Sequence, residues 1–234
     1  MANKYDRVML KLSGEALTSE KNFRIDTETV NRICEGVREA QQTGAQIAIV
    51  VGGGNFWRGR SGGEMERTRS DQIGMLATVM NALAVADALE RMGWEVRVQT
   101  ALTMTAVAEP YIRRRAERHF EKGRVVIFGA GTGNPYFTTD TAAVLRAQEI
   151  HAELLLKATK VDGIYSSDPM QNKDAVRYDT ATYMEVLAQQ WQVMDRTAIS
   201  LAMDNNLPLV VFKLMEKDNL IRIICGEKIG TQIS

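Results

Sequence analysis

The chain has 234 residues, of which 45% are hydrophobic and 25% are charged, and its formal net charge is zero. This balance is typical of a globular protein with a sizeable core, and it argues against a surface for nucleic acid or an acidic membrane. Two cysteines make no disulfide framework, and the polar N-terminus does not resemble a signal peptide. No apolar run reaches the ~20 residues of a membrane span. We therefore expect a single cytoplasmic domain over residues 1–234.

The first half of the chain alternates short apolar runs with apolar residues at helical spacing, a pattern that predicts strands and helices in turn. Arg60, Arg67 and Arg69 lie between two such elements and are expected to be solvated loop charges. Cys34 falls on an apolar helical stripe and is expected in the core. Strands are predicted at 8–12, 47–51 and 96–98, and helices from Asp26 to the stop at Gly44, from Ser70 or Asp71 to about Met92, and from Glu109-Pro110 onward, with proline in the first turn.

The second half continues the alternation, which predicts an α/β fold with a mostly parallel sheet. Residues 220–224 form a short helix or strand, and residues 230–233 are expected to be a closing edge strand. Further strands are predicted at 125–128, 154–156 and 207–212, and helices from near Asp140 to about Ile150, from Met184 to Trp191, and after an N-cap at Asp195.

Glycine-rich turns and basic side chains follow several of these strands. Gly52 to Gly54 ends one strand and Gly129 to Gly133 ends another, while Lys11 and Lys157 lie near the ends of two more. Ligands of parallel sheets bind outside the carboxyl ends of the strands, so these segments should meet at one edge. Backbone N–H groups in glycine turns and at helix N-termini bind phosphate. With Arg58 beside them, the segments predict a site for phosphate-rich ligands.

The parts of several other chemistries are missing from the sequence. It has no Walker A motif, no histidine or cysteine cluster for zinc, and its two histidines, His119 and His151, lie away from the glycine turns. The spacing of residues 129–133 is not that of a dinucleotide fingerprint. Phosphoryl transfer mainly requires positioning and cations. A phosphate acceptor is already ionised at neutral pH and needs no general base, which suits this set of residues.

Four motifs carry a resemblance that covers essentially the whole chain. They are Lys11-Leu12-Ser13-Gly14, Gly52-Gly53-Gly54-Asn55 with Arg58, Gly131 to Asp140, and Lys157 to Gly163. Together they resemble the amino acid kinase superfamily. Asp71 followed by Gly74 to Asn81, together with the Thr-Gly-Asn-Pro run at Thr132 to Pro135, is similar to the bacterial uridylate (UMP) kinases of that superfamily.

The resemblance implies a three-layer αβα sandwich that transfers the γ-phosphoryl group of ATP, with Mg²⁺, to UMP in pyrimidine nucleotide synthesis. It implies that Lys11 and Lys157 neutralise the moving phosphoryl group and that Asp140 and Asp195 orient these lysines. Asp71 would bind the ribose hydroxyls. The ATP-binding residues implied are Lys11, Leu12, Ser13, Gly14, Gly54, Arg58, Thr159, Tyr165 and Asp168, and the UMP-binding residues are Gly53, Asp71, Thr132, Gly133, Asn134, Pro135, Tyr136, Phe137, Thr138 and Thr139.

The same resemblance implies a homohexamer that GTP activates and UTP inhibits. The loop from Ser19 to Arg24 departs from the glycine-rich pattern that in many relatives is associated with the response to GTP. The sequence therefore supports GTP activation less than it supports the other implied properties. Two alternatives to a UMP kinase stay open. One is a kinase of the same fold that acts on a carboxylate or a carbamate, and the other is a nucleotide- or oxyanion-binding protein without activity.

Overall fold

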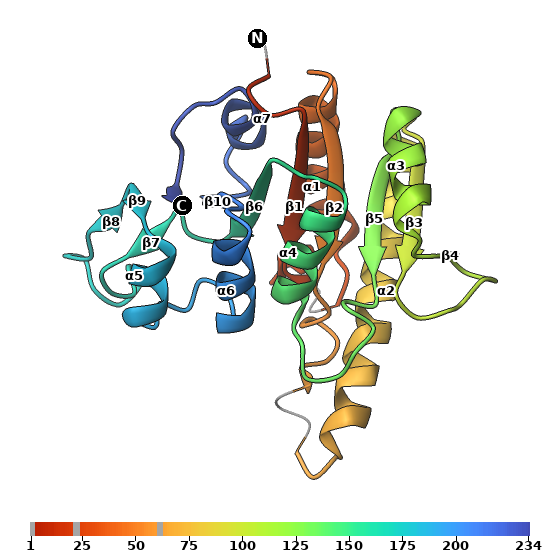
Figure 1. The fold of residues 1–234 in the computed structure, drawn as a ribbon, viewed down its shortest axis with the longest axis horizontal. Coiled ribbons are helices and arrows are strands. Elements are labelled where there is room, and N and C mark those ends of the chain that lie inside the picture. The colour runs from red at the N-terminus through yellow and green to blue at the C-terminus, as the bar shows by residue number, and fades with distance from the viewer. Residues whose placement is uncertain (1–2, 21–23, 60–62) are drawn as a thin grey trace.

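The computed structural model describes residues 3–20, 24–59 and 63–234. Within these residues the chain forms a nine-stranded sheet in the order β4-β3-β5-β2-β1-β6-β10-β11-β9 (Figure 1). All neighbours are parallel except β10 and β11. A parallel sheet requires crossover connections, which explains the alternation of strand and helix in the sequence. The predicted α/β class with a mostly parallel sheet is confirmed.

The strands of the large sheet are β1 (Arg7–Leu12), β2 (Gln46–Val51), β3 (Val96–Thr100), β4 (Glu109–Pro110), β5 (Val125–Gly129), β6 (Leu154–Thr159), β9 (Thr180–Ala181), β10 (Leu209–Lys213) and β11 (Thr231–Ile233); β7 (Ile164–Tyr165) and β8 (Arg177–Tyr178) form a separate ribbon. The helices are α1 (Thr27–Gln41), α2 (Arg67–Arg91), α3 (Arg113–Glu121), α4 (Thr139–Glu149), α5 (Tyr183–Ala188), α6 (Arg196–Asp204) and α7 (Asn219–Ile224), and η1 (Gly14–Leu17) is a 3₁₀ turn.

Two hydrophobic clusters cover the two faces of the sheet and make three layers. Successive side chains of a strand point to opposite faces. In β1, Val8, Leu10 and Leu12 pack in one cluster with α1, α2 and α7. Met9 packs in the other cluster, with α3, α4, α5 and α6, and α4 is seen across β1 and β2 in Figure 1. The expected αβα sandwich is therefore what the chain forms, and Lys11 alternates onto the α4 face.

Helix α2 is long and apolar enough to cross a membrane by length and composition, but 56% of its apolar window is buried. Its buried residues pack beside α1 on the sheet, as expected for a core helix. Cys34 of α1 is fully buried in the same cluster, as predicted. Part of α2 projects beyond the sheet at the bottom of Figure 1.

Several predicted boundaries are wrong. Glu109-Pro110 does not open a helix: these residues form β4, which pairs with β3 at the sheet edge, where proline is tolerated because no partner needs its missing N–H. Helix α2 begins at Arg67, capped by Glu66, so Arg67 and Arg69 are helical residues and not loop charges. Arg60 lies outside the described residues. Strand β11 is not the edge, because β9 pairs with its outer side.

Candidate active site

A cleft of about 1020 Å³ lies at the carboxyl ends of the central strands. The chain order reverses around β1, which has β2 on one side and β6 on the other, and such switch points leave a crevice for ligands. The predicted site residues that line the cleft are Gly53, Gly54, Arg58, Asp71, Thr132, Asn134, Phe137, Thr138, Thr139, Asp140, Lys157 and Asp195. The two glycine turns therefore meet at one edge, as predicted.

Two buried lysines stand side by side at the base of this cleft. Strands β1 and β6 are parallel neighbours whose register places Lys11 directly opposite Lys157. Only 6% of the Lys11 side chain and 11% of the Lys157 side chain are exposed. Two ammonium groups this close repel each other, and burial deprives both of water. The pair therefore requires an anion.

Asp140 supplies that anion. Its Oδ1 lies 2.6 Å from Nζ of Lys11 and 2.7 Å from Nζ of Lys157. Thr138 caps α4, accepting hydrogen bonds from the backbone N–H groups of Asp140 and Thr141, so Asp140 lies in the first helical turn, where the helix dipole stabilises a carboxylate. One negative charge between two positive ones leaves a net positive site.

The electrostatics of the three groups follow from this geometry. Burial alone would raise the pKa of Asp140, but the two lysines outweigh it and hold that pKa at about 2. Burial, together with the charge of Lys11, lowers the pKa of Lys157 to about 8. Asp140 is thus a permanent carboxylate that cannot accept a proton near neutral pH, and Lys157 stays charged only up to mildly alkaline pH.

The glycine turn after β2, residues 52–55, is held by close packing and by buried amides. A side chain on Gly14 would meet the backbone of Gly52 and Gly54 at 2.8 Å, and one on Gly53 would meet the carbonyl oxygen of Gly74 in α2 at 2.8 Å. Asn81 of α2 is fully buried and donates to the carbonyl of Gly52 at 2.7 Å. These contacts fix backbone N–H groups next to the cleft, an arrangement suited to phosphate.

Arg58 follows this turn and lies at the mouth of the cleft. It forms an ion pair with Glu15 of η1. Both side chains are exposed, so the pair contributes little to stability and can open when an anion arrives. Glu15 and Trp57 also line the cleft, and the sequence patterns did not predict either residue.

Residues 132–139, for which the resemblance implies acceptor binding and which are therefore called the acceptor loop, form the opposite wall. At its end Asp195 accepts hydrogen bonds from the hydroxyls of Thr138 and Thr141, and it also caps α6 through the backbone N–H of Ala198. The expected cap on α6 is confirmed. Among the described residues, the hydrogen-bond partners of Asp195 are Thr138, Thr141 and Ala198, so Asp195 anchors the acceptor loop to α6. The lysine-orienting role implied for Asp195 stays a prediction.

Near the middle of the acceptor loop, Tyr136 has a left-handed backbone with φ of 71°. Its backbone N–H donates to Oδ2 of Asp71 at 2.8 Å, across 65 residues of sequence. Asp71 is held in turn by Nε of Arg67, one helical turn earlier, at 2.8 Å. The side chain of Asp71 is 10% exposed and lines the cleft. Asp71 is not the N-cap of α2, because the helix begins four residues earlier, at Arg67.

Other predicted residues lie outside the walls of the cleft. Thr159, Tyr165 and Asp168 belong to β6 and the segment after it. There the Tyr165 hydroxyl donates a hydrogen bond to Asp162, and Asp168 accepts a hydrogen bond from the backbone N–H of Met170. Lys11 does not line the cleft itself, but it forms an ion pair with Asp140, which does. The remaining predicted residues away from the cleft lining are Leu12, Ser13, Gly14, Gly133, Pro135 and Tyr136. Lining residues that the sequence patterns missed include Arg67, Gln192, Val193 and Met194, of which only Arg67 had a signal, its spacing of four from Asp71.

The described residues contain no group of three or more acidic, histidine or cysteine side chains that could hold a metal ion. Among the carboxylates lining the cleft, Glu15, Asp71, Asp140 and Asp195 all have protein partners. This fits Mg²⁺ that arrives with nucleotide phosphates and keeps several waters, and it does not fit a dedicated metal cage.

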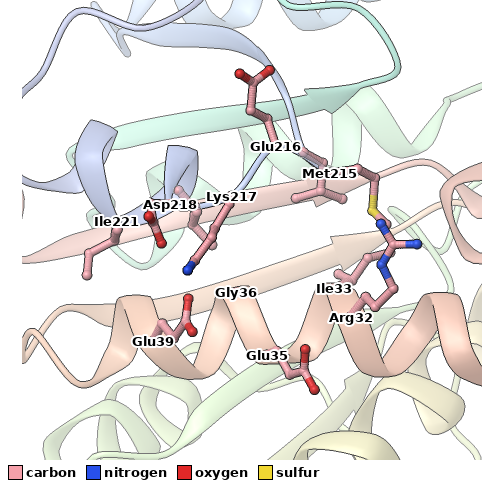
Figure 2. Close-up of a pocket in the computed structure, with 12 residues that line it drawn as sticks. Arg32, Ile33, Glu35, Gly36, Glu39, Met215, Glu216, Lys217, Asp218 and Ile221 are labelled. Carbon is pink, nitrogen blue, oxygen red and sulfur yellow. The ribbon is translucent and has the colours of Figure 1, made fainter.

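A second, smaller cavity of about 270 Å³ lies between α1 and the segment 214–218 (Figure 2). Figure 2 shows Lys217 above Glu39 of α1, with Glu35 and Arg32 farther along the same helix. Four acidic and two basic side chains line it together with apolar ones, and neither of the glycine turns after β2 and β5 reaches it. The cleft at the strand ends is therefore the candidate active site.

Comparison with known proteins agrees with this geometry. The profile of the amino acid kinase family matches residues 6–213. The structure is similar to the UMP kinase from Bacillus anthracis, with 41% identity, a TM-score of 0.94 and coverage of 98% of this chain and 96% of that one. It is also similar to the UMP kinase from Ureaplasma parvum (34%, TM-score 0.90, 99% of both chains) and to the uridylate kinase from Archaeoglobus fulgidus (28%, TM-score 0.73, 97% and 99%). The chain belongs to the amino acid kinase family.

Proposed function

We propose that this protein transfers the γ-phosphoryl group of MgATP to UMP, giving UDP and ADP, as a step of pyrimidine nucleotide synthesis toward CTP in the cytoplasm. The observation that carries the proposal is the pair of buried lysines around Asp140, between a glycine turn and the acceptor loop. Three similar structures, described as UMP or uridylate kinases, support the choice of acceptor.

The geometry suits transfer between two phosphates. The transition state of phosphoryl transfer spreads negative charge over the equatorial oxygens, and preorganised cations stabilise it. Lys157 lines the cleft and carries such a charge, while Asp140 keeps both lysines in place. A UMP phosphate is ionised at neutral pH, so the acceptor needs no general base. Asp140, with its low pKa, does not have to act as one.

The two substrates divide the site as follows. On the ATP side we place Gly54, Arg58 and the first motif from Lys11 to Gly14, together with Thr159, Tyr165 and Asp168 beyond the cleft. On the UMP side we place Gly53, Asp71 and the acceptor loop from Thr132 to Thr139. Mg²⁺ bound to ATP supplies further neutralisation of the phosphates. A cleft of about 1020 Å³ is large enough for both reacting ends.

The test is a coupled assay for ADP formation with purified protein, MgATP and each nucleoside monophosphate in turn. We expect UMP to be the preferred acceptor. Turnover of a carboxylate or carbamate without turnover of UMP would replace the proposal with another kinase of the fold. Nucleotide binding without turnover of any acceptor would identify a non-catalytic binding protein.

The pH dependence of activity is expected to report Lys157. The charged lysine is the active form, so kcat/KM for ATP should fall as pH rises through about 8, approaching about tenfold per pH unit. The fall in kcat should lie at higher pH, because bound phosphates favour the charged form. Initial rates between pH 6 and 10 measure both. A kcat/KM that stays constant to pH 10 would contradict this role of Lys157.

The homohexamer and the effector responses remain proposals. Along α2, Leu76, Met80 and Leu83 are 51%, 46% and 36% exposed, which leaves an apolar surface that suits a subunit contact. UTP inhibition follows from the resemblance alone. The loop whose departure from the family pattern weakens the expectation of GTP activation runs from Ser19 to Arg24, and its residues 21–23 lie outside the described part of the chain.

A further inference from the structure

The carboxylate of Asp71 has one oxygen committed to the protein. Its Oδ2 accepts from Nε of Arg67 and from the backbone N–H of Tyr136, each at 2.8 Å. The Arg67 guanidinium also lies 5.5 Å from the ring centre of Tyr136, so the same side chain supports the left-handed corner of the acceptor loop. Arg67 therefore contacts both residues that join α2 to the loop, Asp71 and Tyr136.

The other oxygen, Oδ1, faces Gly59. A Cβ on Gly59 would overlap Oδ1 and would lie 3.1 Å from Cγ of Asp71. Gly59 cannot easily retreat, because its carbonyl accepts a hydrogen bond from the Ser70 hydroxyl at 2.9 Å. Ser70 is 1% exposed and itself accepts from the indole N–H of Trp57 at 2.9 Å. The backbone at residue 59 is thus pinned against α2 beside Asp71.

These contacts restrict Asp71 to one orientation. A carboxylate has about four acceptor positions, and the described residues fill two of them, both on Oδ2. The side chain is nearly buried yet lines the cleft, so Oδ1 is the oxygen with capacity left for a ligand. Two adjacent hydroxyl groups, such as the 2′- and 3′-hydroxyls of a ribose, are donors that such an oxygen accepts.

We propose that Arg67 and Gly59 are positioning residues that aim Asp71 at the ribose diol of the acceptor and so make the enzyme prefer ribonucleotides to deoxyribonucleotides. This inference rests on the proposed function, because it takes UMP as the acceptor. Arg67 fixes Oδ2, and the missing side chain at Gly59 leaves Oδ1 its place. Neither residue is required to touch the substrate.

The test compares UMP with 2′-deoxy-UMP as acceptors for the wild type, Arg67→Met and Gly59→Ala. In the wild type, loss of a hydroxyl that donates to a carboxylate should lower kcat/KM by about 10- to 100-fold. In both variants the preference should shrink to less than about threefold, through a rise in KM for UMP, with KM for ATP unchanged. The two substitutions disturb Asp71 from opposite sides, so they should agree.

Arg91→Met is the matched control. Arg91 forms the same i,i+4 bridge with Asp87 at 2.8 Å on the far end of α2, where no predicted site residue lies. It should keep the full preference for UMP. A general loss of α2 stability would lower activity on both acceptors alike and leave their ratio unchanged.

The outcomes separate the two proposals. If the wild type does not phosphorylate UMP, the proposed function fails. If it does, but either Arg67→Met or Gly59→Ala discriminates between the acceptors as strongly as the wild type, only the positioning role fails. A wild type that does not discriminate also overturns the positioning role, because Asp71 would then not read the diol.

Discussion

Replacing Lys157 with methionine is expected to lower kcat by about 10²- to 10³-fold, the usual effect of removing one preorganised group that stabilises the transition-state charge. Lys11→Ala is expected to have a similar effect, because the two ammonium groups share Asp140 and stand in register on adjacent strands. UMP binding should be largely spared, since the contacts proposed for the acceptor come from Asp71 and the loop from Thr132 to Thr139.

The measurement is kcat from initial rates at saturating MgATP and UMP, with UMP affinity determined separately by titration calorimetry. Lys122→Met is the control, because Lys122 is an exposed residue at the end of α3, away from the cleft. Unchanged turnover in Lys157→Met would exclude this lysine from the chemistry. Loss of UMP binding together with turnover would instead assign it to the acceptor site.

Asp140→Asn is expected to lower the free energy of unfolding by about 3–5 kcal/mol at pH 7. The substitution leaves two buried ammonium groups without their carboxylate, and asparagine of the same shape does not replace the charge. Urea denaturation followed by circular dichroism measures the change. Asp87→Asn, which breaks an exposed pair with Arg91, should cost less than about 1 kcal/mol.

The effect of Asp140 should also depend on pH. Its pKa is lowered from the ordinary carboxyl value to about 2 in the folded protein, so its stabilisation is fully present above the ordinary value. As pH falls toward 2, the carboxylate is lost and the difference between wild type and Asp140→Asn should shrink. A difference that stays constant between pH 7 and pH 3 would contradict the ion-pair explanation.

The carboxylate of Asp140 explains why Lys11 and Lys157 are tolerated in the core of a sheet. A charged group at such a position is costly unless it is paired, and here one carboxylate serves two cations. The arrangement is not optimal for stability, since the pKa of Lys157 is lowered by burial and by Lys11. Incoming phosphate would relieve this repulsion. The repulsion between Lys11 and Lys157 is therefore matched to the negative charge of a phosphate substrate.

Asp195 and Asp71 connect the acceptor loop to two helices. Asp195 ties Thr138 and Thr141 to the start of α6, and Asp71 ties Tyr136 to the start of α2. These contacts restrict the loop, which lowers the entropy that substrate binding must overcome. They suit the acceptor-binding role that we propose for this loop.

The class of fold and the position of the site along the chain could both be predicted from the amino-acid sequence. Apolar runs and helical stripes depend on neighbours a few residues away, so they identify most strands and helices. The glycine turns and Lys11 and Lys157 could be placed at one edge because parallel strands end together. The short edge strand at Glu109-Pro110 could not be predicted, since its pairing with β3 outweighs the local helical signal of a proline in a first turn.

Which side chains meet could not be predicted from the sequence and depends on the packing of the folded chain. The register of β1 on β6 puts the two lysines opposite each other, and the start of α4 brings Asp140 between them. The contact of Asp71 with Tyr136 spans 65 residues, and Gly59 is required because Asp71 occupies the space of its missing side chain. Such contacts depend on how crossovers dock helices on the sheet. That docking is a property of the whole core, and no local sequence pattern records it.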